Sequence, residues 1–166
     1  MSRATEDPAA RLIAELTARG LRVAVAESLT GGLVVAELTS VPGASVVVNG
    51  GVVAYDTAVK RSVLGVSAEL LKREGAVHPE VARQMADGVR RVLAIDDRAA
   101  DLGIATTGVA GPTGQDGRPP GTVHVGIAFG GEVESLDLAL HGTRAEIRAA
   151  TVRAAIEAAL ARVTSV

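Results

Sequence analysis

The sequence predicts a single α/β domain over residues 1–166, with three layers in which helices cover both faces of a mixed, mostly parallel β-sheet. Short runs of β-branched and small apolar residues alternate with helical patterns along the chain, which is typical of parallel strands joined by helices. Two strand candidates follow each other directly near the C-terminal end and predict an antiparallel strand. The length of 166 residues fits one domain of ordinary size.

The first half of the chain alternates helix and strand. Its apolar spacing, glycines and prolines predict a helix over 8–19, a strand over 21–26 and a helix over 31–40. The segment 45–55 leaves two interpretations open. Its Asn-Gly dipeptide favours a hairpin, whereas its continuous valines favour a buried strand with a glycine bulge.

The second half combines short helices with the later strands. The patterns predict helices near 57–64 and 67–74, a longer helix from Pro79, a strand over 100–108, two strands within 122–140 joined at Gly130-Gly131, and a last helix from Thr143. Thr143 and Glu146 have the spacing of a capping box. The loop 108–121 is the only long irregular piece, and such loops in compact domains are usually functional or disordered.

The composition argues against several classes of function. With 17 basic and 19 acidic residues, the net charge of -2 gives no basic field for nucleic acid, and one Phe, one Tyr and no Trp give no stacking platform. The lack of cysteine excludes disulfides and thiol chemistry, and three scattered histidines disfavour a metal site. Apolar runs end before 18 residues, which argues against a membrane span. Together these observations predict a cytoplasmic protein without membrane or nucleic-acid partners.

The stretch "AVAESLTGG" at 24–32 connects an apolar strand to a helix. If that helix begins near Thr30 or Gly31, its free backbone N–H groups and the positive end of its dipole can bind an anion or an oxyanion. Ser28 would then lie at the mouth of this site. In the other interpretation Ser28 and Thr30 only cap the helix. The residues alone leave both interpretations open.

A second candidate loop is "TTGVAGPTGQDGRPPG" at 106–121. Its glycines allow the backbone to approach a ligand, and its prolines stiffen the chain. These features fit a cradle for phosphate or carboxylate and fit a surface Ω-loop equally well. Neither loop matches the dinucleotide or P-loop glycine patterns, which disfavours both kinds of nucleotide site.

A serine nucleophile needs a base, and the histidines provide none by pattern. "AESLT" is not the G-x-S-x-G elbow, and each histidine has a structural interpretation. A lysine can act as base if burial lowers its pKa by about 3 units. Lys72 lies in a charged stretch, whereas Lys60 follows the strand candidate and the only tyrosine, Tyr55. The alternative is a snorkelling lysine beside an edge tyrosine.

Five motifs together resemble the CinA C-terminal domain family. They are "AESLTGG", "GGVVAYDTAVKRSVLGV", "GAVHPEVARQMA", "TTGVAGPTG" followed by "PPGTVHVGIA", and "HGTRAEIR", and in this order they cover about residues 8–162. Members of this family resemble nicotinamide-nucleotide amidohydrolases. These enzymes convert nicotinamide mononucleotide to nicotinate mononucleotide and ammonia without metal or cofactor. The resemblance implies this activity here and, with the small residues of the last helix, suggests a homodimer.

The resemblance also implies roles for single residues. Ser28 matches the nucleophile, Lys60 the base, and Tyr55 a hydrogen-bonding partner that orients or relays the proton. A hydroxyl of the family's site matches Thr107, with the neighbouring Thr106 as the alternative. We expect Glu27 to support the loop and the backbone near Thr30, Gly31 and Gly32 to supply oxyanion donors. The glycine loop, with Gly108 and Gly111, would hold ribose or phosphate, and Arg144 would be an anion partner or a surface arginine at the start of the helix.

The leading prediction is therefore an amidohydrolase that acts on nicotinamide mononucleotide through a serine nucleophile and a lysine base. One alternative is a competence- or damage-associated protein that binds a nucleotide or anion with the same loops and does not turn it over. Another is an amidohydrolase of a different small amide. Full-length CinA proteins have an additional N-terminal nucleotide-processing domain that these 166 residues do not contain, so no pyrophosphatase activity is predicted.

Overall fold

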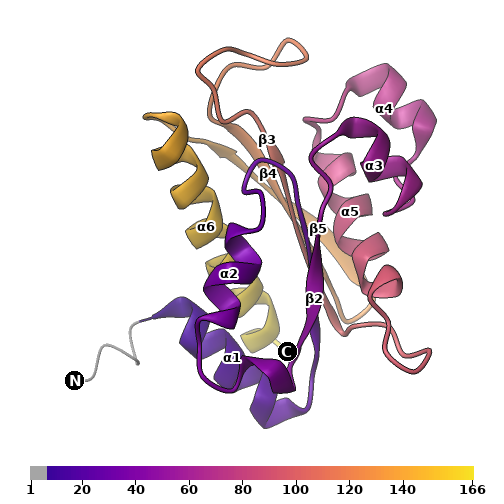
Figure 1. The fold of residues 1–166 in the computed structure, drawn as a ribbon, viewed down its shortest axis with the longest axis vertical. Helices are drawn as coiled ribbons and strands as arrows, with labels where there is room; N and C mark the ends of the chain where they lie inside the picture. Colours follow the sequence, from indigo (N-terminus) through magenta and orange to yellow (C-terminus); the bar gives the residue numbers. More distant parts are fainter. Residues whose placement is uncertain (1–6) are drawn as a thin grey trace.

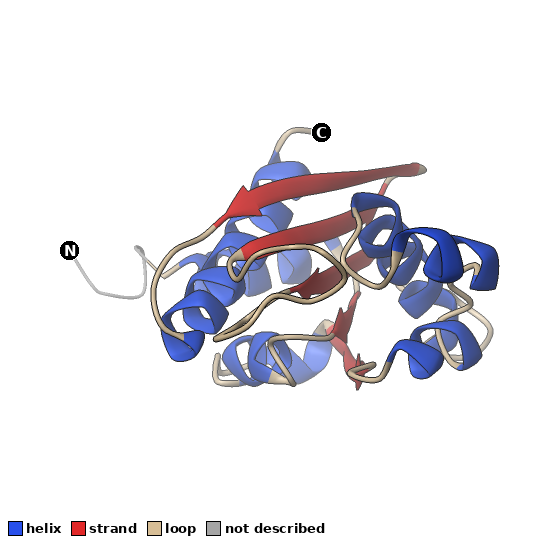
Figure 2. Ribbon diagram, turned by 90° about the horizontal axis from the view of Figure 1, so that it is seen from above, coloured by secondary structure: helices blue, strands red, loops and turns tan. Residues whose placement is uncertain are grey.

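The computed structural model describes residues 7–166 and places a five-stranded sheet between two sets of helices (Figures 1 and 2). In sheet order, the strands are β2 (Val48–Val53), β1 (Val23–Glu27), β3 (Leu102–Gly108), β4 (Thr122–Phe129) and β5 (Glu132–Ala139). The helices are α1 (Pro8–Arg19), α2 (Leu33–Thr39), α3 (Thr57–Ser62), α4 (Ala68–Glu74), α5 (Pro79–Val92) and α6 (Arg144–Thr164), and the 3₁₀ helix η2 (Ala44–Val46) precedes β2.

The sheet is mixed. β1 pairs in parallel with β2 and β3, whereas β4 pairs antiparallel with both β3 and β5. Only β4 therefore runs against the other four strands. β4 and β5 meet at Gly130-Gly131, whose φ values of 62° and 83° suit a tight hairpin turn. The predicted α/β class, with its antiparallel strand late in the chain, is confirmed.

Two apolar cores lie on opposite faces of the sheet. On one face, α1, α2 and α6 cover a core that includes Val23 and Val25 of β1. On the other face, α3, α4 and α5 cover a core that includes Ala24 and Ala26. Because successive side chains of a strand point to opposite faces, β1 contributes to both cores and is buried along its whole length. The end of β1 is thus fixed between the two layers.

The close approach of α5 to the sheet depends on two glycines. A Cβ atom at Gly103 of β3 would lie 2.0 Å from the carbonyl oxygen of Ala86, and one at Gly126 of β4 would lie 2.1 Å from that of Ala82. A larger residue at either position would push the helix away from the strands. The short distance brings the chain that leads into α5 against the end of β3, where Thr107 Oγ1 donates to the carbonyl of Ala76 at 2.7 Å.

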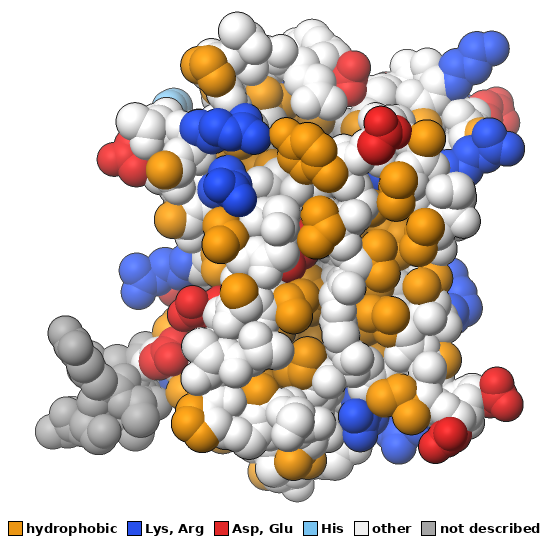
Figure 3. Space-filling view, in the orientation of Figure 1, with side chains coloured by type: hydrophobic (Ala, Val, Ile, Leu, Met, Phe, Trp, Pro, Cys, Tyr) orange, Lys and Arg blue, Asp and Glu red, His pale blue; other side chains and the backbone are white. Residues whose placement is uncertain are grey.

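The segment 45–55 contains a single bulged strand, β2, after the end of η2, so the hairpin interpretation is wrong. Val23 pairs with Val48 and Ala24 pairs with Gly50, and this shift of register leaves Asn49 as the extra residue of a bulge. The expectation of a buried strand is also wrong, because β2 lies at the edge of the sheet and is only half-buried. Hydrophobic side chains lie on both sides of this edge strand (Figure 3).

The helix boundaries agree with prediction to within two residues, and one difference changes the site. α2 begins at Leu33, after the predicted start near Thr30 or Gly31. Gly31 and Gly32 have φ values of 60° and 105°, which lie outside the right-handed helical region. The predicted capping box at the start of α6 is present and joins Thr143 to Glu146.

Candidate active site

The alternation of side chains along β1 separates the two residues that follow its apolar part. Glu27 lies on the same face of the sheet as Val23 and Val25 and points toward α2. The backbone N–H groups of Val34 and Val35 donate to its carboxylate. Ser28 points to the other face of the sheet, toward α3. A strand that is buried on both faces therefore delivers a carboxylate to one layer and a hydroxyl to the other.

Ser28 and Lys60 are in direct contact. The Lys60 Nζ atom lies 2.9 Å from Ser28 Oγ and donates to the carbonyl of Ala54 at 2.7 Å. Lys60 is only 1% exposed, and Ser28 is 7% exposed. The Asp56 carboxylate caps α3 by accepting from the Ala58 N–H at 2.8 Å. This cap fixes the start of the helix that carries Lys60.

Burial lowers the pKa of Lys60 from 10.5 to about 8, against the opposing effect of the nearby Asp56 charge. Within residues 7–166 the Nζ atom forms no salt bridge, and its partners are a hydroxyl and carbonyl groups. With a pKa of about 8, roughly one molecule in ten carries a neutral Lys60 at pH 7. The direction of this hydrogen bond can therefore reverse, so that the Ser28 hydroxyl donates to a neutral Lys60 amine.

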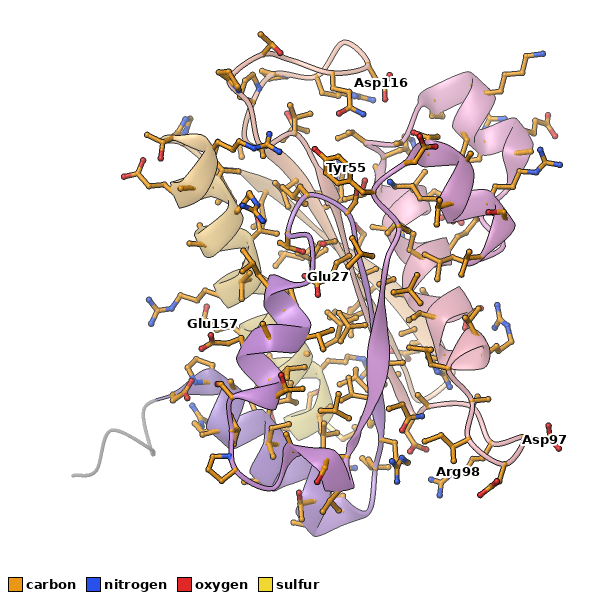
Figure 4. All side chains as sticks on the ribbon, in the orientation of Figure 1. Glu27, Tyr55, Asp97, Arg98, Asp116 and Glu157 are labelled. Carbon is orange, nitrogen blue, oxygen red and sulfur yellow. The ribbon has the colours of Figure 1, made fainter. Side chains whose placement is uncertain are left out.

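Glu27 is a buried cap of α2. Its Oε1 atom accepts from Thr30 Oγ1 at 2.6 Å and from the Val34 N–H at 2.8 Å, and its Oε2 atom accepts from the Val35 N–H at 3.1 Å. Figure 4 shows Glu27 beneath the loop that connects β1 to α2. These bonds narrow the expected anion site, because the carboxylate of the chain itself occupies the N–H groups of the first turn of α2 and leaves only those of the preceding loop.

The two adjacent threonines of β3 have different surroundings. Thr106 points toward α2, where its Oγ1 lies 2.8 Å from Thr30 Oγ1, and its backbone carbonyl accepts from the Ser28 N–H at 3.0 Å. Thr107 points to the opposite face and contributes to the wall of a pocket beside Ser28. Thr106 is fully buried and lies outside that wall. Its expected contact with a substrate is therefore corrected to a contact that supports the loop behind Ser28.

A pocket of about 440 Å³ opens beside Ser28. Its walls come from five parts of the chain: residues 28–29, 55–57, 76–77, 107–111 with 113–115, and Arg144. Gly108 and Gly111 belong to the wall, whereas Gly31 and Gly32 do not. The volume falls within the range of small-molecule sites.

The long loop is part of this pocket, which supports the interpretation as a ligand cradle over that of a free Ω-loop. Its tip folds into a tight turn at Asp116-Gly117, closed by reciprocal backbone hydrogen bonds between Gln115 and Arg118. The Asp116 carboxylate accepts from the Ala76 N–H at 3.2 Å, and Asp116 lies at the end of the loop in Figure 4. The loop is thereby attached to the opposite wall.

Tyr55 and Arg144 meet at the rim of the pocket. Arg144 donates to the phenol oxygen of Tyr55 at 3.1 Å and to the carbonyl of Gly111 at 2.7 Å. Tyr55 is 62% exposed, and only its backbone carbonyl approaches Lys60 Nζ, at 3.5 Å. In this structure the phenol of Tyr55 contacts Arg144 and not Lys60, so its expected role in orienting or relaying the proton stays a prediction.

Two contacts at the site were missed by sequence reasoning. Arg148 of α6 donates from Nε to the carbonyl of Leu29 at 2.9 Å and from Nη2 to that of Thr30 at 3.3 Å. The contact of Ala76 with both Thr107 and Asp116 was also missed. The spacing of Arg144 and Arg148, one helical turn apart, places both near the start of α6 and is the only signal in the sequence for the first contact.

Neither histidines nor a metal cluster take part in this arrangement within residues 7–166. His78 caps α5 by accepting from the Glu80 N–H at 3.1 Å, and His124 lies 2.8 Å from the Asp137 carboxylate. Among the described residues, no three His, Cys, Asp or Glu side chains gather in a way that could hold a metal ion. In the same part of the chain, every helix is too short or too polar to cross a membrane.

The comparison with protein families matches the CinA C-terminal domain to residues 5–163. The chain belongs to the CinA C-terminal domain family. It is 49% identical over 144 residues to a putative competence-damage inducible protein of Geobacillus kaustophilus and 48% identical over 146 residues to a CinA-like protein of an Anaeromyxobacter species. These matches cover 86% and 87% of this chain and 34% of each relative. The chain thus spans about a third of the length of these curated CinA relatives.

Solved structures of the CinA superfamily share the fold. A protein of Klebsiella pneumoniae superimposes with a TM-score of 0.89 at 33% identity, covering 96% of this chain and 97% of the other. A competence/damage inducible protein of Agrobacterium tumefaciens gives a TM-score of 0.86 at 39% identity, covering 97% and 96%. The family and the fold implied by the sequence motifs are confirmed. The names of these relatives state competence or damage induction and specify no reaction.

We expect the stability that Lys60 contributes to depend on pH. Below pH 8 the amine is protonated in the folded and unfolded states, so the folded state bears the whole penalty of a buried charge. Between about pH 8 and 10.5 only the unfolded state keeps the proton, so the wild-type protein should gain about 3 kcal/mol of unfolding free energy relative to Lys60→Met. Urea unfolding across this range measures the difference.

Lys72→Met serves as the control, because it removes the exposed lysine of α4 and should leave this pH dependence in place. A difference between the wild type and Lys60→Met that stays constant from about pH 7 to 10.5 would contradict the lowered pKa.

Proposed function

We propose that this protein is an amidohydrolase that hydrolyses the carboxamide of nicotinamide mononucleotide, with Ser28 as nucleophile and Lys60 as base. The observation that supports the proposal most strongly is the 2.9 Å contact between Ser28 Oγ and the Nζ atom of a buried lysine whose pKa is about 8. A serine is a weak nucleophile unless a neighbouring group accepts its proton. A buried lysine with a lowered pKa is such a group.

The first half of the reaction is acylation of the serine. Lys60 in its neutral form accepts the Ser28 proton while Oγ attacks the carboxamide carbon, and the resulting ammonium returns that proton to the nitrogen that leaves as ammonia. In the second half, neutral Lys60 accepts a proton from water, and the hydroxide attacks the ester carbon. The proton returns to Ser28 Oγ as the C–O bond breaks, which restores the enzyme and releases the carboxylic acid.

The oxyanion of the tetrahedral intermediate needs hydrogen-bond donors near Ser28. The N–H groups of Leu29, Thr30 and Gly32 have no acceptor within residues 7–166, whereas the Gly31 N–H donates to the Ser28 carbonyl at 3.0 Å. Gly31 is thereby removed from the donors expected from the sequence. Leu29 contributes to the pocket wall, which favours its N–H as the donor next to the nucleophile.

The phosphate of a mononucleotide fits the other end of the pocket. The Arg144 guanidinium lies at the rim and its two hydrogen-bond partners, the Gly111 carbonyl and the Tyr55 hydroxyl, are both neutral. A guanidinium without a carboxylate partner can form charge-assisted hydrogen bonds with a phosphate. The backbone of Gly108 and Gly111 lines the space between Arg144 and Ser28, where a ribose would lie.

We expect the wild-type protein, freed of metal, to release ammonia from nicotinamide mononucleotide. Ser28→Ala and Lys60→Met should each lower kcat/KM by about 10³-fold or more, because the nucleophile and its base act as a unit. Lys72→Met, the exposed-lysine control, should match the wild type. Binding of the nucleotide without ammonia release by the folded wild type would contradict the amidohydrolase and favour a binding protein.

We expect Arg144 to distinguish the nucleotide from its nucleoside. Arg144→Met should lower kcat/KM for nicotinamide mononucleotide by about 10- to 100-fold, because a charge-assisted contact with phosphate is lost. It should leave the slower turnover of nicotinamide riboside nearly unchanged. Arg118→Met is the control, because it removes a positive charge at the tip of the loop 108–121. Equal turnover of both compounds by the wild type would contradict a phosphate site and would favour another small amide as substrate.

The composition of the chain predicts a cytoplasmic location, and the resemblance to the family together with the small residues of the last helix predicts a homodimer; both points stay predictions. Gel filtration with light scattering would measure the assembly state of the purified chain.

A further inference from the structure

Arg148 approaches the loop that carries Ser28 from the side of α6. Its Nε atom donates to the Leu29 carbonyl at 2.9 Å and its Nη2 atom donates to the Thr30 carbonyl at 3.3 Å. These are the first two peptide carbonyls between Ser28 and the glycines at 31–32. A single planar guanidinium therefore holds two consecutive peptide groups through its fixed fork of donors.

The loop needs such an anchor because its sequence is flexible. Gly31 and Gly32 have positive φ values, and glycine permits several backbone conformations at similar energy. Rotation of the Leu29–Thr30 or Thr30–Gly31 peptide would turn a carbonyl away from Arg148 and break a charge-assisted hydrogen bond. Arg148 thus favours one orientation of the peptides that follow the nucleophile.

The glycine at 31 and the arginine fit one another. A Cβ atom at Gly31 would lie 3.4 Å from Nη2 of Arg148, at the limit of ordinary van der Waals contact. The guanidinium therefore packs directly against the backbone of Gly31, and it is the positive φ of 60° that favours glycine at this position.

We propose that Arg148 is a positioning residue that fixes the Leu29–Thr30 and Thr30–Gly31 peptide groups, so that the Thr30 N–H stays free to stabilise the oxyanion beside the Leu29 N–H. The proposal rests on the hydrolytic function proposed above. In a trans peptide the N–H points opposite to the carbonyl, so a donor that holds the Leu29 carbonyl also sets the direction of the Thr30 N–H. Arg148 lies outside the pocket wall and acts through the loop.

The test uses the full chain with Arg148→Met, Arg148→Lys and the control Arg153→Met. Methionine keeps much of the length of the arginine stem without donors, and Arg153 is a 73% exposed residue of the same helix that pairs with Glu157. We expect Arg148→Met to lower kcat for nicotinamide mononucleotide by about 10- to 100-fold with little change in KM, because a small misplacement of the loop affects the transition state most. Arg148→Lys should recover part of kcat.

A second readout does not require turnover. Hydrogen exchange of the Gly31 amide, which donates to the Ser28 carbonyl, should become about tenfold faster or more in Arg148→Met than in Arg153→Met. A wild-type protein without ammonia release would contradict the proposed hydrolysis, and the exchange rate would then decide on Arg148 alone. Wild-type kcat together with wild-type exchange at Gly31 in Arg148→Met would overturn the inference, and so would an equal change in Arg153→Met.

Discussion

The contact between the Ser28 hydroxyl and the Lys60 amine depends on the position of β1 at the centre of the molecule. The strand is buried on both faces, and its strict alternation sends Glu27 to the α2 layer and Ser28 to the α3 layer. The same register hydrogen-bonds the Ser28 N–H to β3 and leaves the side chain free for Lys60. A shift of one residue would exchange the carboxylate and the hydroxyl, so the chemistry of the site is fixed by the packing of the sheet.

Burial of Lys60 without a carboxylate partner destabilises the fold and lowers the pKa of the amine that contacts Ser28. The lowered pKa measures this penalty, because it is the preference of the folded state for the neutral amine. The Glu27 carboxylate, also buried, has the opposite role, since its three hydrogen bonds hold the loop and the start of α2 in place. Two buried ionisable groups thus lie on either side of one strand, one supporting the loop and one in contact with the Ser28 hydroxyl.

Much of the fold follows from local patterns in the sequence. Helical spacing, caps and glycine stops defined α1, α4 and α6, and the Gly-Gly turn between β4 and β5 was predicted because turn chemistry is local. The hairpin interpretation of 45–55 was wrong because Asn-Gly fits a bulge as well as a turn, and pairing with β1 decided between them. The edge position of β2 depends on the order of strands, which no local pattern records.

The site was predicted less completely than the fold. The loop position and the scarcity of lysine indicated Ser28 and Lys60 only as candidates, and the resemblance to the family paired them; the structure places them in contact. Thr106 was expected to contact substrate, but its side chain points to the α2 face, and the contact of the Tyr55 phenol with Arg144 was not predicted. Both directions depend on where each strand ends and on which face it presents. Arg148 was missed because it contacts backbone carbonyls 118 and 119 positions away, and its spacing from Arg144 places it on the helix without indicating those partners.

The most direct test of the account is whether Ser28 is a nucleophile activated by neutral Lys60. A fluorophosphonate, which phosphonylates activated serines with loss of fluoride, can be followed by mass spectrometry of the intact protein and of the peptide that contains Ser28. The account predicts one adduct, on Ser28, whose rate of formation increases as pH rises through about 8, and no adduct on the same timescale in Lys60→Met. Labelling that proceeds equally in Lys60→Met, or a wild-type protein that stays unlabelled above pH 8, would contradict it.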